Sequence, residues 1–190
     1  MTPDSRQALR AELRARRQAL DARTRLAAGQ AIADLLRPGL GGYVAGYWAM
    51  DGEVPLLALL SGPRDFVYCL PVLQPGKRLR FAPWRHGDPL VQNRFGIPEP
   101  DLDPGSLLDP EALDHVLLPL VGFDGRGHRL GTGGGYYDRS FAFRHGALRK
   151  PRLVGIGYAC QQVDALPAAD WDVPLDLIAT ERGLLDPQRN

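Results

Sequence analysis

Apolar residues recur at helical spacing in the first forty positions of the chain. In residues 5–20, Leu9, Leu13 and Leu20 fall on one face of a helix rich in good helix formers. The stretch 21–24 has the composition of a turn with a helix cap. A second helix is predicted over residues 25–37, because Pro38 and Gly39 follow it and end the pattern.

From residue 43 onward the pattern changes to short apolar runs bounded by turn residues. These runs predict strands at 43–48, 66–72, 78–84, 115–123, 153–159 and 176–181, the last in the chain, with a short helix at 54–60. The segment 85–114 is rich in Pro, Asp and Gly and is expected to run over the surface. Several strands are apolar on both faces and alternate with helices, which favours an α/β domain with a largely parallel sheet.

The composition is typical of a globular protein. The 190 residues, 44% apolar and 24% charged, fit one domain over 1–190. A net charge of +1 gives no overall field toward nucleic acid or anionic membranes. No apolar run approaches the roughly 20 residues that a membrane helix needs, and the arginine-rich N-terminus lacks the apolar core of a signal peptide. We expect a soluble, cytoplasmic protein with neither nucleic acid nor membrane as a partner.

Cysteine and histidine offer little chemistry. Cys69 and Cys160 form no disulfide framework and have no metal-ligand spacing, and both lie in apolar stretches, so buried free thiols are expected. The four histidines have no zinc spacing either, and we interpret them as structural or surface residues: His86, His115, His128 and His145.

A glycine-rich loop is the most informative feature. In GFDGRGHRLGTGGGYYDR, residues 122–139, seven of the first fourteen positions are glycine. An apolar run precedes the loop, and the start of a helix over YYDRSFAF, residues 136–143, is expected after it. Backbone N–H groups in such a loop can approach a ligand closely, and a helix start favours phosphate. A plain turn between two elements is the alternative.

The loop fits neither of the two common nucleotide fingerprints. It lacks the Lys-Ser/Thr that ends the P-loop, and Tyr136 occupies the position of the last glycine in G-x-G-x-x-G. A phosphate site here would therefore need a different type of loop. It would use N–H donors from Gly131 to Gly135 and cations from elsewhere in the chain.

The first helix is a candidate source of those cations. Between Ser5 and Arg25 the chain has seven arginines and two acidic residues, and four arginines form a stripe next to the leucines: Arg6, Arg10, Arg14 and Arg17. Three interpretations remain open at this point: a source of charge for the loop, a solvated helix face, or an RNA-binding arm. The lack of interleaved aromatic residues and the neutral overall charge weaken the last of these.

Three carboxylates are candidates for ligand contacts. Asp138 follows the glycine loop and Asp172 lies in a late turn, and Mg²⁺ that serves a nucleotide needs only one or two carboxylates besides phosphate oxygens and water. Glu53 follows the predicted strand end YWAMDG, where α/β sheets place ligands. The alternatives are a helix-terminal carboxylate for Asp138 and Glu53, and an ordinary turn aspartate for Asp172.

Several ordered segments resemble the 5-formyltetrahydrofolate cyclo-ligases, also called 5,10-methenyltetrahydrofolate synthetases. LPLVGFDGRGHRLGTGGGYYDR resembles the family's signature. Weaker matches occur in the right order around it: RQALRAELRARRQAL, YWAMDGEVPLLALL, FVYCLPV, RLRFAPW, NRFGIPEP and ADWDVPLDLIATE. Two positions depart from the pattern, because Arg6 stands where lysine is frequent and Gly134 where some members carry a basic residue. The expected fold is a single three-layer α/β/α domain with a Rossmann-like sheet and a basic first helix.

The resemblance implies that the chain closes 5-formyltetrahydrofolate, which can carry a polyglutamate tail, to 5,10-methenyltetrahydrofolate. This reaction uses ATP and Mg²⁺ and releases ADP and phosphate, and the protein is expected to be a monomer. In the resemblance, Mg²⁺ is held by Asp138 and Asp172, and Arg129 and Tyr137 are catalytic. Folate contacts are implied for Trp48, Glu53, Thr132, Gly133, Gly134, Gly135 and Tyr136. Contacts to ATP are implied for Arg6, Arg10, Arg129, Leu130, Gly131, Thr132, Gly133, Gly134, Gly135, Tyr136 and Tyr137.

Two other classes of function are compatible with the residues alone. A sugar-phosphate isomerase or CoA-transferase on a similar scaffold would need no ATP and would use a Glu or Asp as base or nucleophile. A non-enzymatic RNA- or nucleotide-binding module would use the arginine helix and bind RNA with a steep salt dependence.

Overall fold

The computed structural model describes residues 3–146, 150–167 and 169–189. Its helices are α1 Pro3–Gln18, α2 Ala22–Leu36, α3 Leu57–Leu60 and α4 Tyr136–Ser140. Its strands are β1 Gly42–Ala45, β2 Phe66–Gln74, β3 Arg78–Pro83, β4 Leu90–Gln92, β5 Pro98–Pro100, β6 His115–Pro119, β7 Gly122–Phe123, β8 Arg129–Leu130, β9 Arg152–Ile156, β10 Leu177–Thr180 and β11 Gly183–Leu185. Among these residues no helix combines the length and the apolar character that a membrane span requires.

Seven strands form one sheet in the order β11-β10-β9-β6-β1-β2-β3. The pairings from β10 across to β2 are parallel, whereas β11 and β3 run antiparallel at the two edges. The prediction of an α/β fold with a largely parallel sheet is therefore confirmed. The chain passes from β1 to β2 on one side and later places β6 on the other, so the strand order reverses at β1. A crevice at the carboxyl ends of the strands is expected at such a point.

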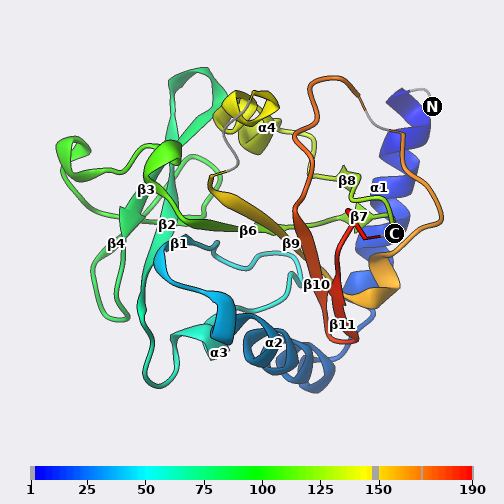
Figure 1. Cartoon of the computed structure of the whole chain (residues 1–190), viewed down its shortest axis with the longest axis horizontal. Helices are drawn as coiled ribbons and strands as arrows, with labels where there is room; N and C mark the ends of the chain where they lie inside the picture. Colours follow the sequence, from blue (N-terminus) through cyan, green and yellow to red (C-terminus); the bar gives the residue numbers. More distant parts are fainter. Residues whose placement is uncertain (1–2, 147–149, 168, 190) are drawn as a thin grey trace.

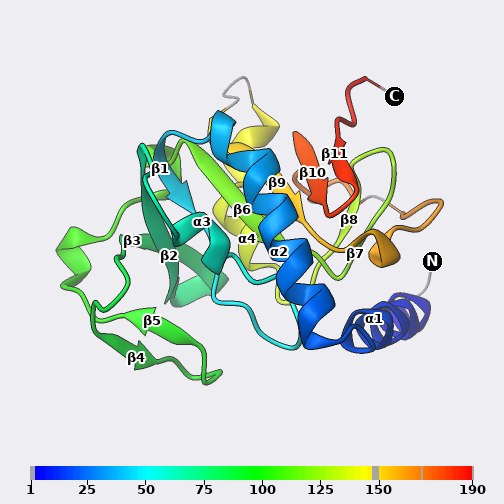
Figure 2. The ribbon, with the colours of Figure 1, turned by 90° about the horizontal axis from the view of Figure 1, so that it is seen from below.

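Helices cover both faces of the sheet. In Figures 1 and 2, α2 and α3 lie on one face, and α4 lies on the other. Successive residues of β6 point to opposite faces: Leu117 packs in the core under α2 with Ile32, and Val116 packs in the opposite core with Phe141. Both faces of the central strands are therefore buried, which explains why their sequences are continuously apolar.

The first helix lies to the side of these layers. It packs on the hairpin of β7 and β8, where Leu13 is buried against Val121 and Leu130. Both views show α1 beside this hairpin, and Figure 2 shows its end leading through a short connection into α2 (Figures 1 and 2). The contact brings one face of α1 toward the segment that follows β8, which is the part of the glycine-rich loop from Gly131 to Gly135.

The predicted strand over 115–123 is divided in the structure. The N–H of Leu120 still bonds to Ile156 in the sheet, but the N–H of Val121 bonds to Leu130 instead. The chain thus leaves β9 and pairs with β8, and a Cβ on Gly122 would lie 2.4 Å from a methyl carbon of Leu13. The close approach of α1 requires glycine here, and the apolar pattern alone did not reveal it.

Other predicted boundaries also change. Strand β1 ends at Ala45 rather than at residue 48, and the helix predicted over 54–60 is the single turn α3. The strand at 176–181 is not the last, because β11 returns beside it. The excursion at 85–114 is confirmed in outline but contains the hairpin of β4 and β5. The second helix begins earlier than predicted, at Ala22, with Asp21 accepting the cap hydrogen bond from the Thr24 N–H.

A buried ion pair fixes the start of β10. Both oxygens of Asp176 accept from Arg144, at 2.8 and 2.9 Å, and one of them also accepts from the N–H of Leu153 at 2.7 Å. The Arg144 side chain is 6% exposed. We expect Asp176→Asn to lower the free energy of unfolding by about 3 kcal/mol, because it leaves a buried cation without its partner.

Urea denaturation measures this loss. The control is Asp109→Asn, which removes an exposed pair with Arg80 and should cost less than about 1 kcal/mol. Equal losses in the two variants would contradict a special role for the buried pair.

Candidate functional site

A cavity of about 630 Å³ lies at the carboxyl ends of β1, β2 and β6. Leu118 and Pro119 of β6 form part of its wall, together with Pro71 and Leu73 of β2. Further walls come from α1, the glycine loop, the turn after β1, the β4–β5 hairpin and the segment that carries Asp172. All the residues that the sequence suggested for the site line this one cavity: Arg6, Arg10, Trp48, Glu53, Arg129, Leu130, Gly131, Thr132, Gly133, Gly134, Gly135, Tyr136, Tyr137, Asp138 and Asp172.

The glycine loop exposes its backbone to this cavity. In the part of the chain that the structure describes, none of the N–H groups from Gly131 to Tyr137 donates to a backbone carbonyl. Gly133 and Gly135 have φ of 98° and 69°, in the left-handed region. A side chain at either position would be strained, so glycine is required for this backbone path. A row of unpaired donors with small side chains is suited to an anion.

The helix after the loop is shorter than predicted. It covers Tyr136–Ser140, five residues, instead of 136–143, and a 3-10 turn at Ala142–His145 follows. The dipole of one turn is weak compared with that of a full helix. Attraction for an anion must therefore come from the loop's N–H groups and from arginine side chains.

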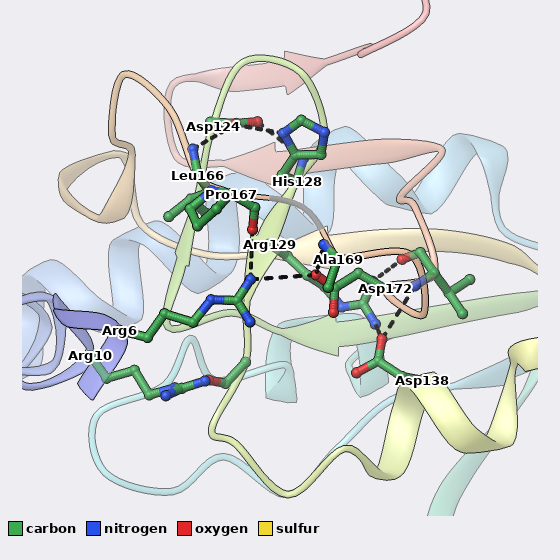
Figure 3. Close-up of polar contacts among 12 residues, drawn as sticks. Arg6, Arg10, Asp124, His128, Arg129, Asp138, Leu166, Pro167, Ala169 and Asp172 are labelled. Atoms are coloured by element: carbon green, nitrogen blue, oxygen red, sulfur yellow. Dashed lines mark hydrogen bonds and ion pairs between the residues drawn. The ribbon is translucent and has the colours of Figure 1, made fainter. Parts of the chain in front are cut away.

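Three arginines of α1 line the cavity, and Figure 3 labels two of them, Arg6 and Arg10. The Nε of Arg10 donates to the carbonyl oxygen of Gly131 at 2.9 Å, which joins the helix to the loop. Arg6 donates to the carbonyl oxygen of Pro167 at 2.7 Å and lies 3.8 Å from Asp172. Partial burial, with Arg6 and Arg14 nearby, lowers the pKa of Arg10. Like charges are thus held together at the cavity, which favours an anionic ligand.

The predicted stripe of four arginines is divided in the structure. Arg14 lines the cavity with Arg6 and Arg10. Arg17 does not: its side chain is 2% exposed and points into the protein. A solvated face is therefore the wrong interpretation for Arg17.

The two predicted metal ligands lie at the same end of the cavity. Asp138 pairs with Arg129, whose guanidinium also donates to the carbonyl oxygen of Val173, and the N–H of Val173 donates to Asp138 at 3.3 Å. Asp172 accepts from the N–H of Ala169 at 2.9 Å. These contacts use one oxygen of each carboxylate.

This arrangement suits a cation that a nucleotide brings with it. Among the described residues there is no group of three or more His, Cys, Asp or Glu that could hold a metal by itself. One or two carboxylates suffice for Mg²⁺ when phosphate oxygens and water complete the shell. Asp138 and Asp172 fit that case. The side chain of Arg129 lies between Asp138 and the loop that carries Asp172 (Figure 3).

Glu53 and Trp48 form the other end of the cavity. The Glu53 side chain is 11% exposed, and its Oε2 accepts from the N–H of Met50 at 3.1 Å. Burial raises the pKa of Glu53, opposed by the Met50 N–H and by Arg17. Trp48 packs edge to face against Trp84, with ring centres 6.0 Å apart. This end combines a shielded carboxylate with an aromatic wall, which suits a flat polar ring.

Two tyrosines at the start of α4 face different surroundings. The ring of Tyr137 stacks on Phe141, and burial raises the pKa of its phenol, with Glu53 and Tyr68 adding to the effect. The phenol therefore stays protonated at neutral pH and can donate a hydrogen bond. Tyr136 instead accepts a hydrogen bond from Arg94 at 2.6 Å.

The tip of the β4–β5 hairpin forms a wall that the sequence did not reveal. Phe95 is exposed, lines the cavity and meets the ring of Tyr136 edge to face at 6.3 Å. Glu99 anchors the hairpin by accepting from Leu73 N–H and from the Asn93 side chain. The single Phe in the Pro- and Gly-rich segment was the available signal, but nothing in the sequence indicated where the hairpin would lie. Trp171, beside Asp172, lines the cavity as well.

A buried carboxylate holds the loop that carries Asp172. Asp124 accepts from the N–H of Leu166 at 2.9 Å and lies 2.9 Å from Nδ1 of His128 (Figure 3). Burial raises the pKa of Asp124, but these hydrogen bonds and those from the N–H groups of Arg126 and His128 outweigh it and leave the pKa below its usual value. His128 is structural, as the sequence suggested.

The cysteines do not line the cavity. Cys69 is buried, and burial raises the pKa of its thiol to about 12. Cys160 is only partly buried, which differs from the expectation of two buried thiols.

Comparison with known proteins gives consistent results. The family model of the 5-formyltetrahydrofolate cyclo-ligase family matches residues 2–181. The 5-formyltetrahydrofolate cyclo-ligase of Haemophilus influenzae is 38% identical over 184 residues, covering 92% of this chain and 97% of that protein. The protein of the same name from Escherichia coli K12 is 41% identical over 143 residues, covering 72% and 76%.

Solved structures agree with this. The NMR structure of Aquifex aeolicus 5,10-methenyltetrahydrofolate synthetase matches with a TM-score of 0.80 and 28% identity, covering 96% of this chain and 93% of that one. A 5,10-methenyltetrahydrofolate synthetase from Mycoplasma pneumoniae matches with a TM-score of 0.71 and 26% identity, covering 93% and 98%. The chain therefore belongs to the 5-formyltetrahydrofolate cyclo-ligase family, a family of ligases.

Proposed function

We propose that this protein uses ATP and Mg²⁺ to cyclise 5-formyltetrahydrofolate to 5,10-methenyltetrahydrofolate, releasing ADP and phosphate. Family membership supports the overall reaction. The observation that carries the more detailed proposal is the shared cavity: the loop, arginines and carboxylates suited to a triphosphate adjoin the Glu53 end, suited to a flat polar ring. Two substrates can meet there.

The chemistry explains why a nucleotide is needed. The formyl oxygen is a poor leaving group, so N10 of the folate cannot displace it directly. In the proposed route the formyl oxygen attacks the γ-phosphorus and ADP departs. N10 then attacks the formyl carbon and loses its proton, the C–O bond breaks, and phosphate leaves. The carbon remains bonded to both nitrogens as the methenyl cation.

Phosphoryl transfer of this kind depends mainly on positioning and charge stabilisation. The N–H groups of Gly131 to Tyr137 and the guanidinium groups of Arg6 and Arg10 are suited to hold the triphosphate. Bound Mg²⁺ would supply further charge neutralisation between Asp138, Asp172 and the phosphates. A protein nucleophile is not required.

Arg129 and Tyr137 are the proposed catalytic residues. Arg129 pairs with Asp138 and lines the cavity, so its charge lies beside the phosphate site. Tyr137 has a protonated phenol on the Glu53 side and can donate a hydrogen bond to a substrate oxygen. At the folate end, Glu53 can accept from the amide and amino groups of the pterin, and Trp48 can pack against the ring.

The activity itself is the first prediction. Protein incubated with 5-formyltetrahydrofolate, ATP and Mg²⁺ should develop the near-ultraviolet absorbance of the methenyl product, and omission of ATP should abolish it. No ATP-dependent absorbance would falsify the proposed reaction. Binding that is indifferent to ATP would favour an isomerase or transferase, and steeply salt-dependent RNA affinity without turnover would favour an RNA-binding module.

The second prediction concerns the metal. Asp138→Asn should raise the Mg²⁺ concentration needed for half-maximal turnover by about tenfold or more, because one anionic ligand is lost. Titration of Mg²⁺ at saturating ATP measures this. Asp170→Asn is the control, since Asp170 is exposed and does not line the cavity. If both variants keep the wild-type requirement, or if Asp138→Asn only lowers the melting temperature, Asp138 is not a ligand.

The third prediction concerns Arg10. Arg10→Met should raise the KM for ATP about tenfold, because a charge-assisted contact to phosphate and the bond to Gly131 are both removed. Arg10→Lys should recover only part of the affinity, since lysine keeps the charge but not the planar geometry. Initial rates at varied ATP measure the change, with Arg23→Met on the exposed face of α2 as control. An unchanged KM for ATP in Arg10→Met would remove Arg10 from the nucleotide site.

A further inference from the structure

Arg17 is a buried cation outside the cavity. Its side chain is 2% exposed, although it lies in a helix whose other arginines reach solvent or the cavity. Burial of a guanidinium is costly unless hydrogen bonds and an opposite charge compensate for it. The compensating groups therefore indicate what Arg17 does.

Three contacts surround the guanidinium. Its Nε donates to the carbonyl oxygen of Asp51 at 3.0 Å, and its Nη1 donates to that of Leu120 at 3.4 Å. The same Nη1 lies 3.8 Å from Oε1 of Glu53. Arg17 thereby connects α1 with the end of β6 and with the turn that carries Glu53.

That turn needs support. It closes through a hydrogen bond from the N–H of Glu53 to the carbonyl oxygen of Met50 at 2.8 Å. Asp51 at its centre has a φ of 48°, which costs energy for a residue other than glycine. The hydrogen bond from Arg17 to Asp51 stabilises this conformation, and the position of the Glu53 carboxylate follows from it.

We propose that Arg17 is a positioning residue that holds the Glu53 carboxylate in place for the folate, although Arg17 does not itself line the cavity. This inference rests on the proposed role of Glu53 in folate binding. It assigns to the first helix two separate tasks: Arg6 and Arg10 serve the nucleotide end of the cavity, and Arg17 serves the folate end.

Electrostatics around Glu53 support the proposal. Charged and titratable groups face it from four parts of the chain. Arg17 and Arg14 belong to α1 and Asp51 to its own turn, and Tyr47 and Tyr137 come from the segment after β1 and from α4. Burial raises the pKa of Glu53, whereas Arg17 lowers it. Loss of Arg17 should therefore raise the pKa further, and Glu53 would become protonated at a higher pH.

A direct test follows the carboxylates by carbon-13 NMR. The chain has five glutamates, so their side-chain carbons can be titrated individually, and Glu53→Gln assigns the signal of interest. Arg17→Met should raise the pKa of Glu53 by about one unit or more, and Arg17→Lys by less. Arg16→Met is the matched control, because Arg16 is an exposed neighbour in the same helix and pairs with Glu12. An unchanged Glu53 titration in both Arg17 variants would overturn the proposal.

Kinetics then separate positioning from general stability. Arg17→Met should raise the KM for 5-formyltetrahydrofolate about tenfold, leave the KM for ATP unchanged and move the acidic limb of kcat/KM to higher pH. In a Glu53→Gln background, Arg17→Met should add no further loss, because the carboxylate that it positions is gone. Additive losses, or equal effects on both KM values, would indicate a purely structural role.

The two proposals can fail separately. Wild-type protein without ATP-dependent turnover would reject the proposed function, while the NMR titration would still report on the Arg17–Glu53 pair. If Arg17→Met does not fold, Arg17→Lys provides both measurements, since it keeps the buried charge. A normal folate KM and pH profile in a folded Arg17→Lys, together with an unshifted Glu53, would contradict the inference.

Discussion

The hydrogen bond from Arg10 to the carbonyl oxygen of Gly131 joins the two halves of the candidate anion site. Gly131 to Gly135 supply backbone donors but no side-chain charge, whereas α1 supplies charge and packs on the hairpin of β7 and β8. Packing of Leu13 against Val121 and Leu130 holds the helix at this position. Arginines from the start of the chain can therefore act on a loop more than a hundred residues later.

The arginines of this site are not all neutralised by carboxylates. Arg129 has its partner in Asp138, and Arg6 lies near Asp172, but within the described part of the chain Arg10 bonds only to a carbonyl oxygen. A triphosphate with Mg²⁺ would add both signs of charge: anionic oxygens for the arginines and a cation for the carboxylates. In the proposed function, the site would therefore suit that pair as a whole rather than either ion alone.

Residues of the glycine loop were recognisable from the sequence because the requirement is local. Positive φ at Gly133 and Gly135 and exposed N–H groups are properties of the loop itself. The hairpin that brings Phe95 to Tyr136 was not predictable, because its tip meets the loop only through tertiary packing across more than forty residues. Arg17 was misjudged for the same reason: it shares the spacing of Arg6, Arg10 and Arg14 but not their surroundings.

Local patterns in the sequence predicted the α/β class and the largely parallel core, because apolar periodicity acts over short distances. Glycine content and nearby carboxylates indicated the loop, Glu53, Asp138 and Asp172, whereas Trp48 and Tyr137 were expected only from the family resemblance. Tertiary structure decided where the chain leaves β6 for a new partner at Val121, because that depends on α1 packing against Gly122. It also decided which arginines face the cavity and which one is buried beside Glu53. Burial and long-range contacts are properties of the folded chain, and no local pattern encodes them.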